Sequence, residues 1–340
     1  LNFKKKDNSK TKLIIKGNHN SQNELNFTEI LIKENNNKIN FENLLLDEDN
    51  LIIKIDKVDL KYFDKENKKN EFLILRNKNN NYKINGSSFN ANKLIDNLLN
   101  NTSGENSKIL KSDISLILKF DKVLIDKKNT VKNLSGELFI KDNKIIKGDI
   151  LGFFEQDGQL KFTINTNDNG EKITTLNSSK AKLMVDRYKF IKGFEEGYLD
   201  FYSIKKNDIS NSVLIIDNFK VQEVPVLAKL LSLASLQGIA DLLTGEGIRF
   251  NNFEMNFSNN EDLMTINELY AIGPSISLLM DGYIQSENLI SLRGTLVPAT
   301  TINKTIASIP LLGDLLIGKK VGEGVFGVSF KIKGPPEDLK

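Results

Sequence analysis

Few residues of this chain could carry out catalysis or bind a metal. The sequence contains no cysteine and only one histidine, His19, which stands in a polar run. Thiolate nucleophiles and cysteine-ligated metal sites are therefore excluded. A Ser-His-Asp triad or a histidine-rich zinc site would depend on His19 alone, and we expect this residue to lie in an exposed loop.

The carboxylates are numerous but scattered. Asp47, Glu48 and Asp49 are consecutive, as are Glu261 and Asp262, and both groups fall in apparent turns. The Asp-x-Asp-x-Asp-Gly spacing of a calcium loop is absent. We therefore expect solvated turns and no metal site, although a pair of hydrolytic carboxylates brought together only by the fold remains open.

Two glycine-rich stretches, residues 245–247 and 322–327, superficially resemble phosphate-binding loops. Neither stands between a buried parallel strand and a helix, and neither carries the Lys-Ser/Thr of a Walker A loop. The Gly-x-Ser-x-Gly nucleophile elbow is also absent. The sequence thus predicts turns before strands at both places, no cofactor, and a protein that is not an enzyme.

The overall charge argues against a nucleic-acid partner. Among 340 residues, 47 Lys and Arg stand against 44 Asp and Glu, and most lysines are interleaved with acidic residues and asparagines. A nucleic-acid-binding protein usually has a basic face or stripe. No run of about 18 apolar residues predicts a transmembrane helix. Because the first residue is Leu and no signal segment follows, we expect an excerpt of a longer protein, with any membrane anchor outside it.

Apolar and polar residues alternate with a period of two along most of the chain. Such alternation, bounded by Asn, Asp and Gly turns, predicts short strands in an antiparallel meander. The clearest segments are residues 13–16, 51–60, 72–76, 114–120, 138–141, 158–165, 199–204, 213–221, 253–258, 276–284, 289–297 and 325–333. We predict a mainly β protein: an elongated, curved antiparallel sheet, like a groove, with a few capping helices.

The alternation gives this sheet one apolar side and one polar side, because successive side chains of a strand point to opposite faces. The apolar side must be covered by a second sheet, by helices, by curvature of the sheet or by a molecule that is not protein. We expect the following residues to line a lipid-binding trough: Phe253, Met255, Phe257, Ile276, Leu278, Met280, Phe326, Val328, Phe330 and Ile332. The alternative is that they form the core of an ordinary β-sandwich.

Helical patterns are few. Residues 90–101 and 224–243 show them most clearly, residues 180–191 more weakly, and residues 301–309 form a short amphipathic turn or helix before Pro310. Together with the breaks at Pro298 and Pro310, the helix of residues 224–243 is predicted to cap one end of the trough, and its alternative role is a surface for a membrane or a partner. Its capping residues are Leu227, Leu230, Leu231, Leu236, Ile239 and Leu242. A soft domain boundary near residue 205 separates residues 1–205 from residues 206–340, unless one continuous sheet spans both.

The segment of residues 224–335 resembles the AsmA-like C-terminal region of YhdP/TamB/AsmA-type bacterial envelope proteins. The resemblance lies in the order and spacing of several stretches. They are the Leu-rich residues 224–248, Phe-Asn-Asn-Phe at 250–253, Ala-Ile-Gly-Pro-Ser at 271–275, Leu-Arg-Gly-Thr-Leu-Val-Pro-Ala at 292–299, Ile-Pro-Leu-Leu-Gly-Asp-Leu-Leu at 309–316, and 326–335. Residues 84–91, followed by a Leu/Ile helix, resemble another piece of that family. Over residues 1–205 the similarity is general.

The resemblance implies a role in the bacterial cell envelope. Such proteins are anchored in the inner membrane, extend through the periplasm as a curved sheet with an apolar trough, and take part in phospholipid transport and outer-membrane integrity. The implied partners of this segment are phospholipid acyl chains, the inner membrane through an anchor outside this segment, and other envelope proteins. The alternative is a structural or assembly β-protein of the envelope without a lipid cargo.

Overall fold

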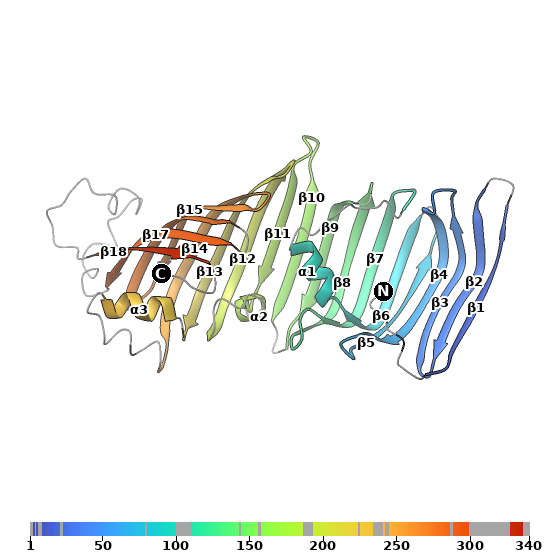
Figure 1. Cartoon of the computed structure of the whole chain (residues 1–340), viewed down its shortest axis with the longest axis horizontal. Helices are drawn as coiled ribbons and strands as arrows, with labels where there is room; N and C mark the ends of the chain where they lie inside the picture. The colour runs from blue at the N-terminus through green and yellow to red at the C-terminus, as the bar shows by residue number, and fades with distance from the viewer. Residues whose placement is uncertain are drawn as a thin grey trace. The chain divides into compact units, whose positions relative to one another are not determined.

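The structure, a computed structural model, consists mainly of β-strands, as the alternation predicts (Figure 1). It describes residues 3, 5, 9–20, 23–78, 80–99, 110–142, 144–155, 158–185, 193–223, 225–233, 241, 245–285, 288–298 and 327–335. Most of these residues lie in strands, and the described part contains three short helices. The predicted fold class, a curved antiparallel sheet with few helices, is confirmed.

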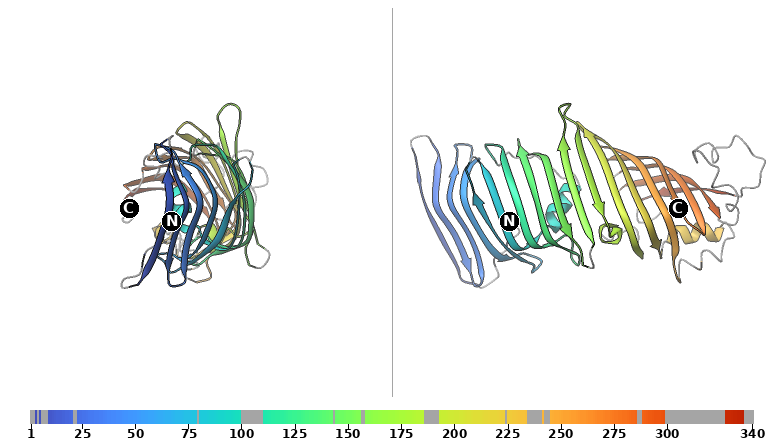
Figure 2. Two further views of the ribbon diagram at one scale, coloured as in Figure 1. Left: turned by 90° about the vertical axis from the view of Figure 1, so that its right-hand side faces the viewer. Right: turned by 180° about the vertical axis from the view of Figure 1, so that it is seen from behind.

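The chain divides into two compact units, Leu1–Thr166 and Asn167–Lys340. The residue near which a domain boundary was predicted, 205, lies in a strand of the second unit, β12 (Phe194–Lys206). Each unit contains consecutive strands that curl into an open sheet (Figure 2).

In the first unit each strand pairs with the next one in sequence. Its strands are β1 (Thr11–His19), β2 (Leu25–Glu34), β3 (Asn37–Leu46), β4 (Ile52–Phe63), β5 (Lys69–Arg76), β6 (Asn81–Asn90), β7 (Ile114–Leu124), β8 (Thr130–Lys141), β9 (Lys144–Phe153) and β10 (Gln159–Thr166). The pair β6–β7 is parallel, whereas the meander pattern predicts antiparallel pairs throughout. The chain between these two strands passes through α1 (Asn92–Leu99). A parallel pair needs such a crossover, because the second strand must begin at the same end of the sheet as the first.

The second unit is an antiparallel meander. Besides β12 its strands are β11 (Lys172–Ser178), β13 (Ile209–Val221), β14 (Ile248–Asn260), β15 (Leu263–Ile272), β16 (Ile276–Gln285), β17 (Leu289–Pro298) and β18 (Val328–Gly334). Each strand segment predicted from alternation lies in a strand or overlaps one. The strands that the sequence pattern does not single out are β2, β3, β6, β9, β11 and β15.

Bulges explain why some strands escape the period-two pattern. The register of β15 against β16 shifts between Ile266 and Leu269, with the extra residue on β15, and that of β1 against β2 shifts between Lys16 and Gly17, with the extra residue on β2. A bulge inserts one residue, so the apolar positions change parity along the strand. The many asparagines serve the turns: Asn35 and Asn207, for example, adopt positive φ, which Asn tolerates better than most residues.

The helices agree with the sequence in position and are shorter than predicted among the described residues. The pattern at residues 90–101 corresponds to α1, and that at 180–191 to α2 (Ala181–Val185). The pattern at 224–243 begins as α3 (Pro225–Leu233), with Pro225 in the first turn, where its missing N–H costs nothing. The predicted turn at residues 301–309 lies outside the described residues.

Candidate functional site

The strand register of the second unit brings apolar side chains into continuous rows on one face. Directly paired residues lie on the same face of a sheet, so the pairings of consecutive strands define each row. One row runs through Phe201, Leu214, Met255, Leu269, Met280, Gly294 and Phe330. A parallel row runs through Leu199, Ile216, Phe253, Ala271, Leu278, Leu296 and Val328, and a third through Ser203, Ser212, Phe257, Ile266, Gly282, Leu292 and Ile332. We call this face the inner face of the second unit.

The predicted trough residues meet on this face. Phe253, Met255 and Phe257 come from β14, Ile276, Leu278 and Met280 from β16, and Val328, Phe330 and Ile332 from β18. Phe326 lies outside the described residues. No trough residues were predicted in β12, β13, β15 or β17. These strands contribute residues such as Phe201, Leu214, Leu269 and Leu292 to the same rows.

The middle of the inner face is only half-buried. Met255, Met280 and Phe330 keep intermediate exposure, although they pack beside the buried Phe257, Ile266 and Leu269 or the cluster at the strand ends. In the part of the chain that the structure describes, no second sheet packs on this face, and the extensive contacts of each strand are with its sheet neighbours. The sandwich core considered as an alternative is therefore not seen there.

One margin of the inner face is covered by α2 and α3. Ala181 of α2 and Leu231 of α3 are fully buried, and Leu227 is nearly so, in a cluster with residues from the ends of β12–β17. Within that cluster the rings of Phe194, Phe219 and Phe250 stack in sequence, at centroid distances of 5.2 and 5.4 Å. Leu227 and Leu231 thus lie where a capping helix would place them, along the strand ends. Nothing is described for the side chain of Leu230, and Leu236, Ile239 and Leu242 lie outside the described residues.

The opposite, outer face of the second unit is mixed: it carries hydrogen-bonded polar residues beside tyrosines and aliphatic residues such as Leu279. The Tyr270 hydroxyl donates a short hydrogen bond to Glu254, and Arg293 forms a bidentate ion pair with Asp281 at 2.9–3.0 Å. Partial burial and the neighbouring Glu254 carboxylate raise the pKa of Tyr270 to about 12, so this hydroxyl stays protonated as a donor. Each strand therefore separates an apolar inner surface from one that carries hydrogen-bonded polar groups.

The first unit repeats this arrangement. Its inner face carries a row from Ile15 in β1 to Phe162 in β10, through Ile30, Phe41, Val58, Ile74, Ile84, Leu118, Gly136 and Ile150. Near α1 the rings of Phe72, Phe89 and Phe120 pack edge-on or tilted, at 5.5–5.7 Å. No trough residues were predicted in the first unit, although the alternation of apolar and polar residues in β4, β5 and β7 indicates an apolar face there as well.

The candidate residues His19 and Asp47 lie in different elements of the first unit. His19 is exposed, as expected, but it is the last residue of β1 and not part of a loop. Burial alone would raise the pKa of Asp47, but hydrogen bonds from the Leu51 and Asp49 amides and the ion pair with Lys111 at 3.0 Å hold it below its ordinary value. Asp47 thus stabilises its own turn.

Two further features can be reported for the described residues. They contain no cluster of three or more His, Cys, Asp or Glu side chains able to hold a metal ion. None of their helices is long and apolar enough to cross a membrane. Residues 245–247 form a turn before β14, as predicted, whereas residues 322–326 lie outside the described part.

Together these features define an open, curled β-sheet protein with an apolar inner face and a more polar outer face in each unit. No protein-family model matches the chain, and no curated protein or solved structure shows significant similarity to it. The membership in the AsmA-like family therefore stays a prediction.

Proposed function

We propose that this chain is a non-enzymatic lipid-binding segment that holds acyl chains on its inner faces. The observation that carries the proposal is the half-buried middle of the inner face of the second unit, around Met255, Met280 and Phe330, on which no second layer packs among the described residues. Three rows across seven strands span on the order of 400 Å², from strand spacing and residue rise. Many residues of these rows, such as Phe257, Ile266 and Leu296, are already buried, and the others keep intermediate exposure. A partly exposed apolar surface of this kind often marks a binding site.

The energetics favour an acyl chain as the occupant. Burial of apolar surface contributes roughly 0.8 kcal/mol per CH₂, so a sixteen-carbon tail gains on the order of 10 kcal/mol before ordering costs. A bilayer offers the same tail a similar gain. Transfer between a membrane and the trough is then nearly isoenergetic and needs no ATP site in this segment.

Within a cell, the proposal extends to the role that the family resemblance implies. The segment would be the periplasmic portion of an inner-membrane-anchored protein and would take part in phospholipid transport to the outer membrane. The apolar rows support this extension only by offering a path along which an acyl chain can slide from strand to strand.

The first test measures lipid bound to the purified chain by mass spectrometry after organic extraction. A matched pair of variants separates the faces: Met280→Asp places a carboxylate on the inner face, and Leu279→Asp places one on the outer face of the same strand. We expect phospholipid on the unaltered chain, at least a tenfold loss for Met280→Asp, since a buried charge lacks a partner there, and little change for Leu279→Asp.

A second measurement guards against a variant that fails to fold. Photoreactive benzoylphenylalanine at position 330 should crosslink to lipid, whereas the same group at position 329, on the opposite face of β18, should not. A chain without lipid and without crosslinks at either position would overturn the proposal and favour the structural or assembly protein.

A further inference from the structure

The outer face of the first unit contains an unusual row of lysines. Lys12, Lys33, Lys38 and Lys61 come from β1, β2, β3 and β4 and are direct cross-strand partners. With neighbouring strands about 4.8 Å apart, the four Cα atoms extend over roughly 14 Å. Like charges directly opposite each other destabilise a sheet, so such a row calls for an explanation.

A second row on the same face contains acidic residues that pair with its lysines, although it too places two like charges, Glu29 and Glu42, opposite each other. There Lys16, Glu29, Glu42 and Lys57 follow one another across the same strands, with ion pairs Lys16–Glu29 at 2.7 Å and Lys57–Glu42 at 2.9 Å. In the lysine row, Lys38 pairs with Asp59 and Lys61 with Glu71. No acidic side chain in the described part of the chain lies within ion-pair distance of Lys12 or Lys33.

The lysine row follows the rim of the apolar inner face. Each lysine stands next in sequence to an inner-face residue, and these neighbours, Leu13, Ile32, Ile39 and Leu60, form an apolar row of their own. Leu13 is exposed and Ile32 is half-buried, whereas Ile39 and Leu60 are buried in the core of the unit. All four lysines lie close to the ends of their strands. At this rim, each lysine on the outer face is therefore adjacent in sequence to an apolar side chain on the inner face.

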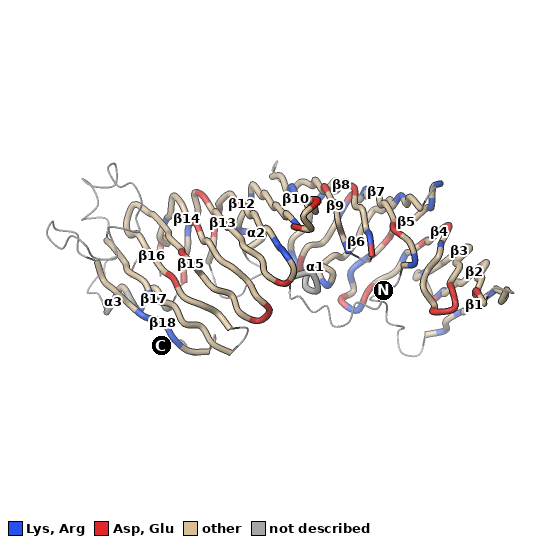
Figure 3. Tube along the Cα trace, turned by 90° about the horizontal axis from the view of Figure 1, so that it is seen from above, with Lys and Arg blue, Asp and Glu red and all other residues tan. Residues whose placement is uncertain are grey.

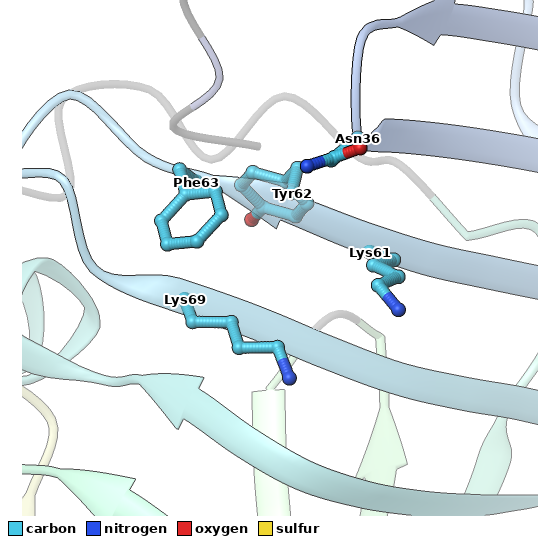
Figure 4. A pocket seen from close by; sticks show the side chains of 5 residues that line it. All are labelled: Asn36, Lys61, Tyr62, Phe63 and Lys69. Atoms are coloured by element: carbon cyan, nitrogen blue, oxygen red, sulfur yellow. The ribbon is translucent and has the colours of Figure 1, made fainter.

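The row ends at a hollow of about 560 Å³ in the outer face. Asn36, Lys61, Tyr62, Phe63 and Lys69 line this hollow, and Figure 4 shows the side chains of Lys61 and Lys69 beside it on the neighbouring strands β4 and β5. Both ammonium groups share one carboxylate, that of Glu71, so one positive charge is left over. Figure 3 marks the basic and acidic residues of both units for comparison.

We infer that this rim, with Lys12, Lys33, Lys38 and Lys61, docks on the phosphate headgroups of an anionic phospholipid bilayer. The inference deepens the proposed function, because a lipid presents phosphate to the lysines and an acyl chain to the accessible Leu13 and Ile32. A nucleic acid offers the phosphates but nothing for the apolar row.

The test is flotation of the whole chain with phosphatidylcholine vesicles, with or without about one third phosphatidylglycerol. We expect binding only to the anionic vesicles, and weaker binding as salt rises, because screening shortens from about 10 Å at 0.1 M to 3 Å at 1 M. The double variant Lys12→Gln/Lys33→Gln should weaken partitioning roughly 25-fold, at about fivefold per lysine near an anionic surface.

The matched control is Lys119→Gln/Lys161→Gln, which removes the same charge from exposed positions on the outer face of the same unit. Lys119 is three strands from Lys61, about 14 Å across the sheet, and is displaced a further three residues along the strand. This control should therefore change partitioning by less than about threefold. Equal losses for both double variants, no preference for anionic vesicles, or tighter binding to a single-stranded oligonucleotide than to vesicles would each overturn the inference.

A failure of the membrane-docking inference can be distinguished from a failure of the proposed acyl-chain binding. Bound acyl chains are counted separately by extraction, so Lys12→Gln/Lys33→Gln should keep its bound lipid. Met280→Asp, in turn, should lose its lipid and still float with anionic vesicles.

Discussion

Glu71 shows how a single side chain joins neighbouring strands of the first unit. Its carboxylate accepts hydrogen bonds from the ammonium groups of Lys69 and Lys61, which lower its pKa from 4.5 to about 2. Because the pKa in the folded chain lies below the unfolded value, the carboxylate stabilises the fold fully above about pH 4.5. This stabilisation is lost as the pH falls toward 2.

We therefore predict that Glu71→Gln makes stability less dependent on pH. At pH 7 the variant should unfold at a lower urea concentration than the unaltered chain, and the difference should shrink steadily between pH 5 and pH 2. Urea midpoints across this range check the prediction, and a difference that stays constant down to pH 2 would contradict it.

At the scale of the element, glycines set how closely the strands of an inner face can approach. A Cβ on Gly294 of β17 would lie 2.3 Å from the Leu279 carbonyl oxygen, 2.6 Å from Met280 Cγ and 2.8 Å from the Phe330 ring. Glycine thus leaves the space that Met280 and Phe330 fill, directly in one of the apolar rows.

We predict that Gly294→Ala destabilises the chain by about 1–3 kcal/mol through overpacking. Gly245→Ala is the control, because the nearest atom to a Cβ there is 3.5 Å away, and it should stay within about 0.5 kcal/mol. Urea titration measures the free energy of unfolding of both variants. Equal losses would show that the close contacts around Gly294 do not restrict the size of this residue.

Helix α3 depends on the sheet for its burial. Leu231 is fully buried among residues of the strand ends, whereas Lys229, two residues earlier, is exposed. In a short helix most of the stability comes from such packing and little from helix propensity.

Leu231→Ala should lower the free energy of unfolding by about 2–5 kcal/mol, since it removes buried methyl groups and leaves a cavity. Lys229→Ala should have almost no effect. Denaturant titration of the two variants side by side tests whether α3 is packed as described.

At the scale of the whole molecule, the fold leaves apolar surface open that ordinary domains bury. Each unit is an open sheet, and in the described part its inner face is covered only at a margin, by short helices. A ligand that binds the folded chain and not the unfolded one then stabilises it by mass action.

Removal of bound lipid should therefore lower the melting temperature, and added phospholipid should restore it. At a free ligand concentration of 100 times Kd the gain is about 2.7 kcal/mol, or roughly 5–10 °C for units of this size. Calorimetry of the delipidated and the reloaded chain measures the shift. A melting temperature that is the same with and without lipid would argue against an acyl-chain ligand.

The sequence by itself determined the fold class and the face on which each predicted trough residue lies. In β14, Phe253, Met255 and Phe257 must share a face because side chains alternate along any strand. Composition alone also excluded cysteine chemistry and left any histidine triad dependent on His19. Both inferences are local: they depend on residue type and on spacing within a few positions.

The tertiary structure alone decided which strands lie side by side and in which register. Alternation cannot tell that Met255, Leu269 and Met280 fall in one row, or that Lys12, Lys33, Lys38 and Lys61 do, because register depends on turns and bulges between strands. It also cannot tell an open apolar face from a sandwich core. That distinction depends on whether a second layer packs on the sheet, a long-range property that no short stretch of sequence encodes.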